Sequence, residues 1–326
     1  MEGMNPYNYR TPIEEAEEFF DREDYLLTGR EFIANKACLS FVGEPRCGLS
    51  SLLNRFNCTD FQQSCAESAG PLRFVPVSCG RFDEPLTLVR YLLKEALPDY
   101  PLPEIPRWRP LYGRLVSGVR RSKGRLVILF DDFEHIGSNE LFVSFIDSLR
   151  GLTQAADMTL ITATHQKLVD CCHVDVARSP FPNIFDARQL HCFTEDQVRH
   201  FLSRTSARSG VDLMPYREGI ESLSGRHPCL LQMACWHYYE ILADEEGGVD
   251  LGRATEAFAH EAEGVFRRMW EGLDEGQREV IRDLARGNAP GTIPSGLYNK
   301  GYVTEDDTIF STAFRDYVMG RRALQM

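Results

Sequence analysis

The stretch that decides the fold reads Phe41-Val42-Gly43-Glu44-Pro45-Arg46-Cys47-Gly48-Leu49-Ser50-Ser51. It follows the phosphate-binding pattern G-x-x-x-x-G-K-[S/T] at Gly43, Gly48 and Ser50. In that pattern the backbone N–H groups of the loop surround a phosphate, a lysine contacts the β- and γ-phosphates, and a hydroxyl binds Mg²⁺. Leu49 stands in the lysine position. The sequence therefore predicts a phosphate-binding loop without its cation.

The segments around this loop predict alternating strands and helices. An apolar run at Cys38–Val42 precedes the loop, and residues Ser50–Phe56 have helical spacing. Further strands are expected at Leu72–Ser78, 126–130 and Met158–Thr164, separated by helices at Asp83–Leu97 and Asn139–Gln154. Strands that alternate with helices are typical of a doubly wound parallel α/β sheet.

A second half-motif follows the most apolar strand, 126–130. That strand ends in Asp131-Asp132-Phe133-Glu134, the layout of a Walker B segment. Asp131 and Ser50 are the predicted Mg²⁺ ligands, and Asp132 and Glu134 are candidate catalytic acids that would orient an attacking water. A solvated polar turn is the alternative interpretation. The two half-motifs in this order favour a P-loop NTPase fold.

The second half of the chain has a helical pattern. Thr194 and Gln197 have the spacing of a capping box at a helix start. Further helices are expected near 212–223, 228–243 and 250–270. The tail Leu273–Arg322 combines two helices with a hairpin around Asp306-Asp307, which predicts a winged helix.

Composition excludes some classes of function. The 326-residue chain has a net charge of −12, which disfavours binding to nucleic acid or to anionic membranes. Ten scattered cysteines and the lack of a long apolar run lead us to expect a cytoplasmic protein. Cys171-Cys172-His173 and His191-Cys192 lack the paired spacing of zinc sites, and we interpret them as core or loop residues.

Five segments, taken in order, resemble the STAND class of AAA-related P-loop signalling ATPases of bacteria. The family's "F-x-G-R-E" lead, phosphate loop, "L-L-D-E-F-E" strand end, "S-P-F-x-N-I-F" segment and "G-G-h-P" turn correspond to Phe19–Glu23, Gly43–Leu53, Leu129–Glu134, Ser179–Phe185 and Gly225–Pro228. The resemblance covers nearly the whole chain. It implies an α/β P-loop core with a helical lid domain and a C-terminal winged helix, divided at 1–36, 37–192, 193–249 and 250–326.

The resemblance also implies a site for ATP or ADP with Mg²⁺. The implied nucleotide-binding residues are Arg22 of the lead, the loop residues Gly43, Arg46, Gly48, Leu49, Ser50 and Ser51, His165 after a strand, and His227 and Pro228 of the turn near the adenine. His165 stands where the family usually has an arginine that senses the γ-phosphate. Asp132 stands where many members have a catalytic glutamate.

Three departures from the family pattern weaken the expected site. Leu49 replaces the lysine, Asp21 replaces the glycine of the lead, and His165 replaces the arginine. One charge-assisted hydrogen bond contributes about 1.5–3 kcal/mol, so Leu49 alone should weaken triphosphate binding by about one to two decades. We expect weak or no nucleotide binding and little hydrolysis, although Arg46 could substitute for the lysine.

These expectations favour a regulatory or scaffold subunit in bacterial signalling or defence, acting with an active paralogue or an effector chain. A slow Mg²⁺-dependent ATPase switch is the first alternative. A DNA-binding regulator is the second, but residues 266–326 contain nine basic and nine acidic side chains. The expected wing tip Glu305-Asp306-Asp307 is acidic where phosphates would lie.

Overall fold

The computed structural model describes residues 5–122, 124–155, 158–244 and 249–323. The chain forms two compact units. Unit 1 comprises Met1–Pro12, Glu44–Gly48 and His191–Met326, and unit 2 comprises Ile13–Gly43 and Leu49–Leu190. The phosphate-binding loop is therefore shared between the units. This division is coarser than the four predicted parts, whose boundaries remain predictions.

Unit 2 contains a five-stranded sheet in the order β2-β3-β4-β1-β5, with all four strand pairs parallel. The strands are β1 (Cys38–Gly43), β2 (Leu72–Ser78), β3 (Arg125–Asp131), β4 (Met158–Thr164) and β5 (Phe185–Leu190). Leu39 of β1 lies between Ile161 of β4 and Asp186 of β5, which gives the register of β1 against its two neighbours. The predicted parallel α/β sheet is confirmed.

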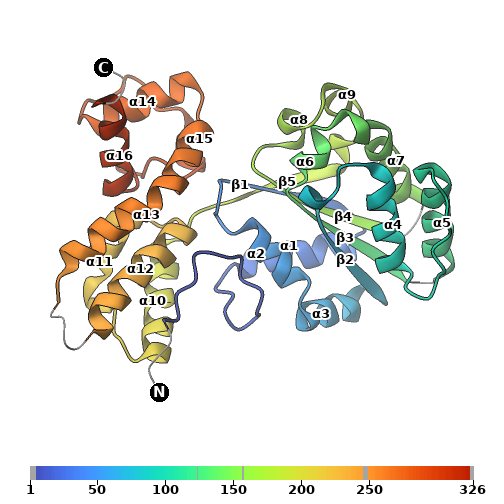
Figure 1. Ribbon diagram of the computed structural model, residues 1–326, viewed down its shortest axis with the longest axis horizontal. Coiled ribbons are helices and arrows are strands. Elements are labelled where there is room, and N and C mark those ends of the chain that lie inside the picture. Colours follow the sequence, from blue (N-terminus) through green and yellow to red (C-terminus); the bar gives the residue numbers. More distant parts are fainter. Residues whose placement is uncertain (1–4, 123, 156–157, 245–248, 324–326) are drawn as a thin grey trace. The chain divides into compact units, whose positions relative to one another are not determined.

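Helices cover both faces of this sheet (Figure 1). The helices of unit 2 are α1 (Glu23–Ala34), α2 (Leu49–Phe56), α3 (Thr59–Ala69), α4 (Pro85–Ala96), α5 (Trp108–Arg121), α6 (Glu134–Gly137), α7 (Val143–Ala155), α8 (Leu168–Cys171) and α9 (Val174–Arg178), with 3₁₀ turns η1 (Cys79–Arg81), η2 (Glu140–Phe142) and η3 (Pro182–Ile184). Side chains that alternate along β2, β3 and β4 pack against α4, α5 and α7 on one face. On the other face, Phe41, Phe56, Phe61 and Phe74 form a continuous series of ring contacts.

The short helices α6, α8 and α9, the longer helix α3 and the strand β5 were not expected from the sequence. Helix α3 carries few apolar residues and buries only Phe61 and Cys65. Strand β5 is an edge strand whose middle residues Asp186, Ala187 and Arg188 are exposed. Neither segment has a strong apolar period, because each buries little of its surface.

Unit 1 is helical. Its helices are α10 (Glu195–Ser209), α11 (Arg217–Ser224), α12 (Pro228–Ala243), α13 (Leu251–Glu271), α14 (Glu275–Ala285), α15 (Ser295–Asn299) and α16 (Thr312–Ala323), with a 3₁₀ turn η4 (Met214–Tyr216). The predicted capping box is confirmed at α10, where Thr194 accepts from the N–H of Gln197 and the Gln197 side chain accepts from the N–H of Thr194. Asp274 and Gln277 form a second capping box at α14.

The predicted C-terminal hairpin is reduced to a single antiparallel bridge between Val303 and Ile309. Backbone hydrogen bonds from Thr304 to Thr308 and from Phe310 to Tyr302 continue this pairing without forming strands. Helices α14, α15 and α16 surround it in sequence. The name winged helix therefore remains a prediction for this module. Among the described residues, no helix has both the length and the apolar character needed to cross a bilayer.

Candidate phosphate-binding site

The loop after β1 has the backbone of a tight turn. Arg46 and Gly48 have positive φ angles of 68° and 104°. For Arg46 this conformation is strained, whereas glycine adopts it readily. A Cβ built on Gly48 meets no atom within 4 Å, so the space beside this residue is open. Leu49, in the lysine position, begins α2 with its residue only 6% exposed. Its side chain is therefore buried.

Unit 2 places the predicted Mg²⁺ ligands together. Asp131 ends β3, and the Ser50 hydroxyl of α2 lies close enough to its carboxyl group to influence its pKa. Burial raises the pKa of Asp131, the negative charge of Asp132 raises it further, and the Ser50 hydroxyl partly lowers it. Oδ1 of Asp131 is buried and has no hydrogen-bond partner among the described residues. A cation at this oxygen would compensate the buried charge.

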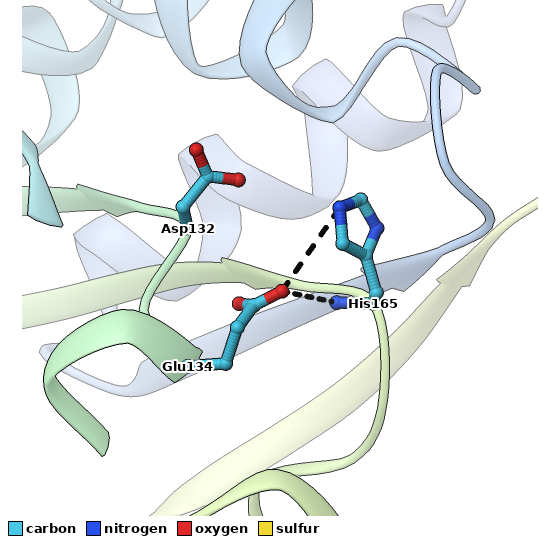
Figure 2. A group of neighbouring side chains, drawn as sticks. All are labelled: Asp132, Glu134 and His165. Atoms are coloured by element: carbon cyan, nitrogen blue, oxygen red, sulfur yellow. Dashed lines mark hydrogen bonds and ion pairs between the residues drawn. The ribbon is translucent and has the colours of Figure 1, made fainter. Parts of the chain in front are cut away.

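The two candidate catalytic acids lie with His165 at the same edge of the sheet (Figure 2). Asp132 has a positive φ angle of 51° and an exposed side chain. Glu134 begins α6, and its Oε1 accepts a hydrogen bond from the backbone N–H of His165 at 3.3 Å. The His165 ring bonds to the carbonyl of Gly43 through Nδ1 at 3.0 Å. Unit 2 therefore gathers the predicted residues Gly43, Ser50, Asp131, Asp132, Glu134 and His165 at one end of the sheet.

Two predicted site residues of unit 2 make other contacts. The Ser51 hydroxyl accepts a hydrogen bond from the backbone N–H of Ile13 at 3.0 Å and so holds the segment that precedes α1. Arg22 is buried, has a φ angle of 76°, and lies 5.6 Å from the ring centroid of Tyr25. The Tyr25 hydroxyl in turn donates to the carbonyl of Gln189 in β5. Arg22 thus packs on a tyrosine that is bonded to the edge strand.

Unit 1 holds the middle of the loop with its own side chains. The guanidinium of Arg46 donates to the carbonyl of Tyr9, and to that of Arg10 at 3.4 Å. His227 is buried, and its Nε2 lies 3.1 Å from the carbonyl oxygen of Pro45. Pro228 is the first residue of α12, a position where a proline loses no helix hydrogen bond. His227 therefore contacts the loop backbone, and Arg46 contacts the N-terminal segment at Tyr9 and Arg10.

Sequence reasoning missed the acid inside the loop. Glu44 is 5% exposed; Lys300 Nζ lies 3.3 Å from its Oε1, and the Tyr302 hydroxyl donates to its Oε2 at 2.7 Å. Burial raises the pKa of Tyr302 well above its ordinary value, and the negative charge of Glu44 raises it further. Because a buried carboxylate needs a compensating charge, Glu44 in the loop could have indicated that a cationic partner exists. The sequence offers no means of choosing Lys300, more than 250 residues away.

The residues present fit part of a nucleotide site. The open turn at Gly48 and the amino terminus of α2 suit an anion, because helix N–H groups there are unpaired. Ser50 and Asp131 would hold Mg²⁺. Arg46 is the only basic residue between Gly43 and Ser51, and its guanidinium already bonds to backbone carbonyls. The loop therefore offers backbone donors to a phosphate and no side-chain cation.

Comparisons with known proteins bear on the family and the fold of this chain. The model of the family described as novel STAND NTPase 2 matches residues 81–290, more than half of the chain and C-terminal to the phosphate loop. A search of the curated proteins gave no match.

Several solved structures share the fold. A Walker-type ATPase of Pyrococcus abyssi is 18% identical with a TM-score of 0.67, covering 95% of this chain and 99% of that chain. The ORC2 protein of Aeropyrum pernix, in ADPNP–ADP complexes, is 12% identical with a TM-score of 0.68 and covers 98% of this chain and 99% of that chain. The ORC1 protein of Aeropyrum pernix, in complex with DNA, is 14% identical with a TM-score of 0.53, covering 94% of each chain.

At these identities the solved structures establish the P-loop NTPase fold alone. The family match extends over strands β3, β4 and β5 and helices α10 to α14 as well as the candidate acids at the sheet edge. This protein belongs to the novel STAND NTPase 2 family.

Proposed function

We propose that this chain is a regulatory or scaffold subunit of the STAND class whose nucleotide site binds ATP or ADP weakly and hydrolyses little. The observation that carries the proposal is the buried Leu49 in the lysine position. A leucine inside the core cannot offer a charge to a phosphate. Hydrolysis suffers most, because the missing cation would stabilise charge that develops in the transition state.

Backbone groups support residual binding. The amino terminus of α2 and the glycine turn can hold a phosphate without a side-chain cation. Titration calorimetry of the nucleotide-stripped protein with ATP and ADP, with and without Mg²⁺, measures what remains. Dissociation constants in the micromolar range would contradict the proposed weakening. An absence of heat at millimolar ligand would identify a loop that keeps only its structural role.

Restoring the lysine gives the sharper test. Leu49→Lys should tighten ATP binding by about one to two decades, since one charge-assisted hydrogen bond contributes about 1.5–3 kcal/mol. Leu141→Lys is the matched control, because it adds the same charge at a side chain that is 64% exposed in η2, outside the loop. Equal affinities in both variants and the parent protein would sink the idea that Leu49 limits binding.

The first alternative is a slow Mg²⁺-dependent ATPase that uses Arg46 in place of the lysine. Its guanidinium contacts the carbonyls of Tyr9 and Arg10, which argues against this role. Asp131→Ala tests the alternative directly, because a Mg²⁺-dependent enzyme should lose phosphate release. Release that persists in this variant would eliminate the ATPase hypothesis.

A DNA-binding function is the second alternative; the expected winged helix suggests it, and the ORC1 structure solved in complex with DNA has a similar fold. The hairpin tip of this chain, Glu305-Asp306-Asp307, is acidic and exposed. Carboxylates at that position repel phosphates. A protein partner, either an active paralogue or an effector chain, is therefore the preferred proposal. Gel-shift titration with random duplex at low salt would reveal the DNA-binding alternative.

A further inference from the structure

Three side chains with metal-binding atoms converge in unit 2 (Figure 2). Asp132 follows β3, Glu134 begins α6 and His165 follows β4. One ligand atom from each lies within 4.8 Å of the other two. The three residues come from two neighbouring strand ends, so the sheet itself sets their spacing.

The ring of His165 is oriented as in a metal ligand. Its Nδ1 lies 3.0 Å from the carbonyl oxygen of Gly43. A carbonyl can only accept, so Nδ1 donates to it, and in the neutral ring Nε2 is then the nitrogen that can bind a metal. Nε2 faces Oε1 of Glu134 at 4.0 Å. Metal-binding histidines almost always donate their other ring N–H to a carbonyl or carboxylate in this way.

The Glu134 carboxylate has an unused oxygen. Oε1 accepts from the N–H of His165, while Oε2 is buried and has no hydrogen-bond partner among the described residues. A buried charged oxygen without a partner is costly, and a bound cation would remove that cost. Asp131 and Asp132 add two further negative charges in the segment 131–134, which ends at Glu134.

We propose that Asp132, Glu134 and His165 bind a first-row transition-metal dication, with Zn²⁺ as its representative, and that they do so without nucleotide. The imidazole ligand favours such an ion over Mg²⁺, which prefers oxygen ligands alone. This inference goes beyond the proposed function, because it involves neither Leu49 nor a phosphate.

The geometry allows closure around an ion. Metal–ligand bonds of about 2.0–2.2 Å in a tetrahedral site place ligand atoms about 3.4 Å apart. Asp132 and His165 are exposed, so side-chain rotation can shorten the present separations. Water would complete the coordination. Because Gly43 ends β1, an ion on His165 would also fix the strand end where the phosphate loop begins.

The test uses the full chain, free of nucleotide and kept reduced. Calorimetric titration with Zn²⁺ and visible absorption with Co²⁺ should both give one ion per chain. Glu134→Gln and His165→Gln should each weaken binding by at least about tenfold, the loss usual for a disrupted metal site. His173→Gln is the matched control. Its ring also lies beside a carboxylate, with Nδ1 3.7 Å from Oδ2 of Asp175, but outside the cluster.

Three results would overturn the proposal. The first is an absence of both heat and Co²⁺ absorption in the folded parent protein. The second is equal affinity in the parent, Glu134→Gln and His165→Gln proteins, with folding verified by circular dichroism. The third is a Co²⁺–thiolate charge-transfer band, which would place the ion on Cys171 or Cys172. None of these results bears on ATP binding, so the two proposals fail separately.

Discussion

Two regions of the molecule treat buried carboxylates in opposite ways. In unit 1, the loop residue Glu44 has an ammonium at 3.3 Å and a hydroxyl at 2.7 Å. In unit 2, one oxygen of Asp131 and one of Glu134 are buried without a hydrogen-bond partner among the described residues. The first carboxylate is compensated by the chain itself. The second group is arranged so that a cation from solution would compensate it.

The contrast separates Glu44, whose charge is compensated by the fold, from Asp131 and Glu134, which keep an oxygen available for a ligand. A buried charge whose partners are all supplied by the fold stabilises one arrangement of the chain and offers nothing to a ligand. A buried charge with unused oxygen atoms raises the free energy of the unliganded protein and lowers that of the liganded one. Substitutions of the same chemical kind should therefore have different signs in the two regions.

The largest effect is expected when Glu44 loses its cation. Lys300→Met should lower the free energy of unfolding by about 2–3 kcal/mol, somewhat less than for a fully buried pair, because the Lys300 side chain is 29% exposed. Lys94→Met, at an exposed site on α4, is the control and should change stability by less than about 0.5 kcal/mol. Urea denaturation measures both. Similar losses of unfolding free energy in the two variants would mean that Lys300 does not stabilise the buried Glu44.

The hydroxyl partner of Glu44 should contribute less. Tyr302→Phe removes a donor that lies 2.7 Å from Glu44 and 2.8 Å from the carbonyl of Met269, at a loss of about 1–2 kcal/mol. A double-mutant cycle with Glu44→Gln isolates the shared term, and we expect coupling of at least about 0.5 kcal/mol. Additive losses would mean that Tyr302 acts only through Met269.

These contacts mark the limit of what the sequence could predict. Strong apolar runs such as 126–130 located the central strands, and Thr194 with Gln197 located the start of α10 correctly. Strand β5 escaped because an exposed edge strand has no apolar period. Ser50 was predicted from the loop pattern and Asp131 from the strand-end pattern, and their role as Mg²⁺ ligands remains a prediction.

Partners that are distant in sequence could not be predicted from local patterns. The Glu44–Lys300 pair and the bond from His165 to Gly43 depend on how the chain folds back on itself. No periodicity or motif records such a pairing in a single sequence. The contacts of Arg46 could not be predicted either, because its carbonyl acceptors, Tyr9 and Arg10, lie more than 30 residues before it in the sequence.

Neutralising Asp131 in unit 2 should raise the stability of the fold, whereas the substitutions around Glu44 should lower it. Burial raises the pKa of Asp131, so the fold favours its protonated form. Its contribution to stability is present below the ordinary pKa of 3.8 and is lost as the pH rises through the folded value. Asp131→Asn should therefore raise the melting temperature at neutral pH, with the gain shrinking toward pH 3.8. Glu44→Gln should lower it. A loss of stability in both variants would contradict the proposed difference between Asp131 and Glu44.

The smallest effect is expected at an exposed acid that has a cation but no burial. Asp60 lies beside Arg55, whose hydrogen bond lowers the pKa of that carboxyl. Asp60→Asn should cost less than about 1 kcal/mol, because water screens a side chain that is 59% exposed. Since a lowered pKa stabilises the fold above its ordinary value of 3.8, the difference should disappear as the pH falls through the folded value. Urea denaturation in 1 M salt should also reduce it. A loss as large as that of Lys300→Met would show that burial does not set the strength of these pairs.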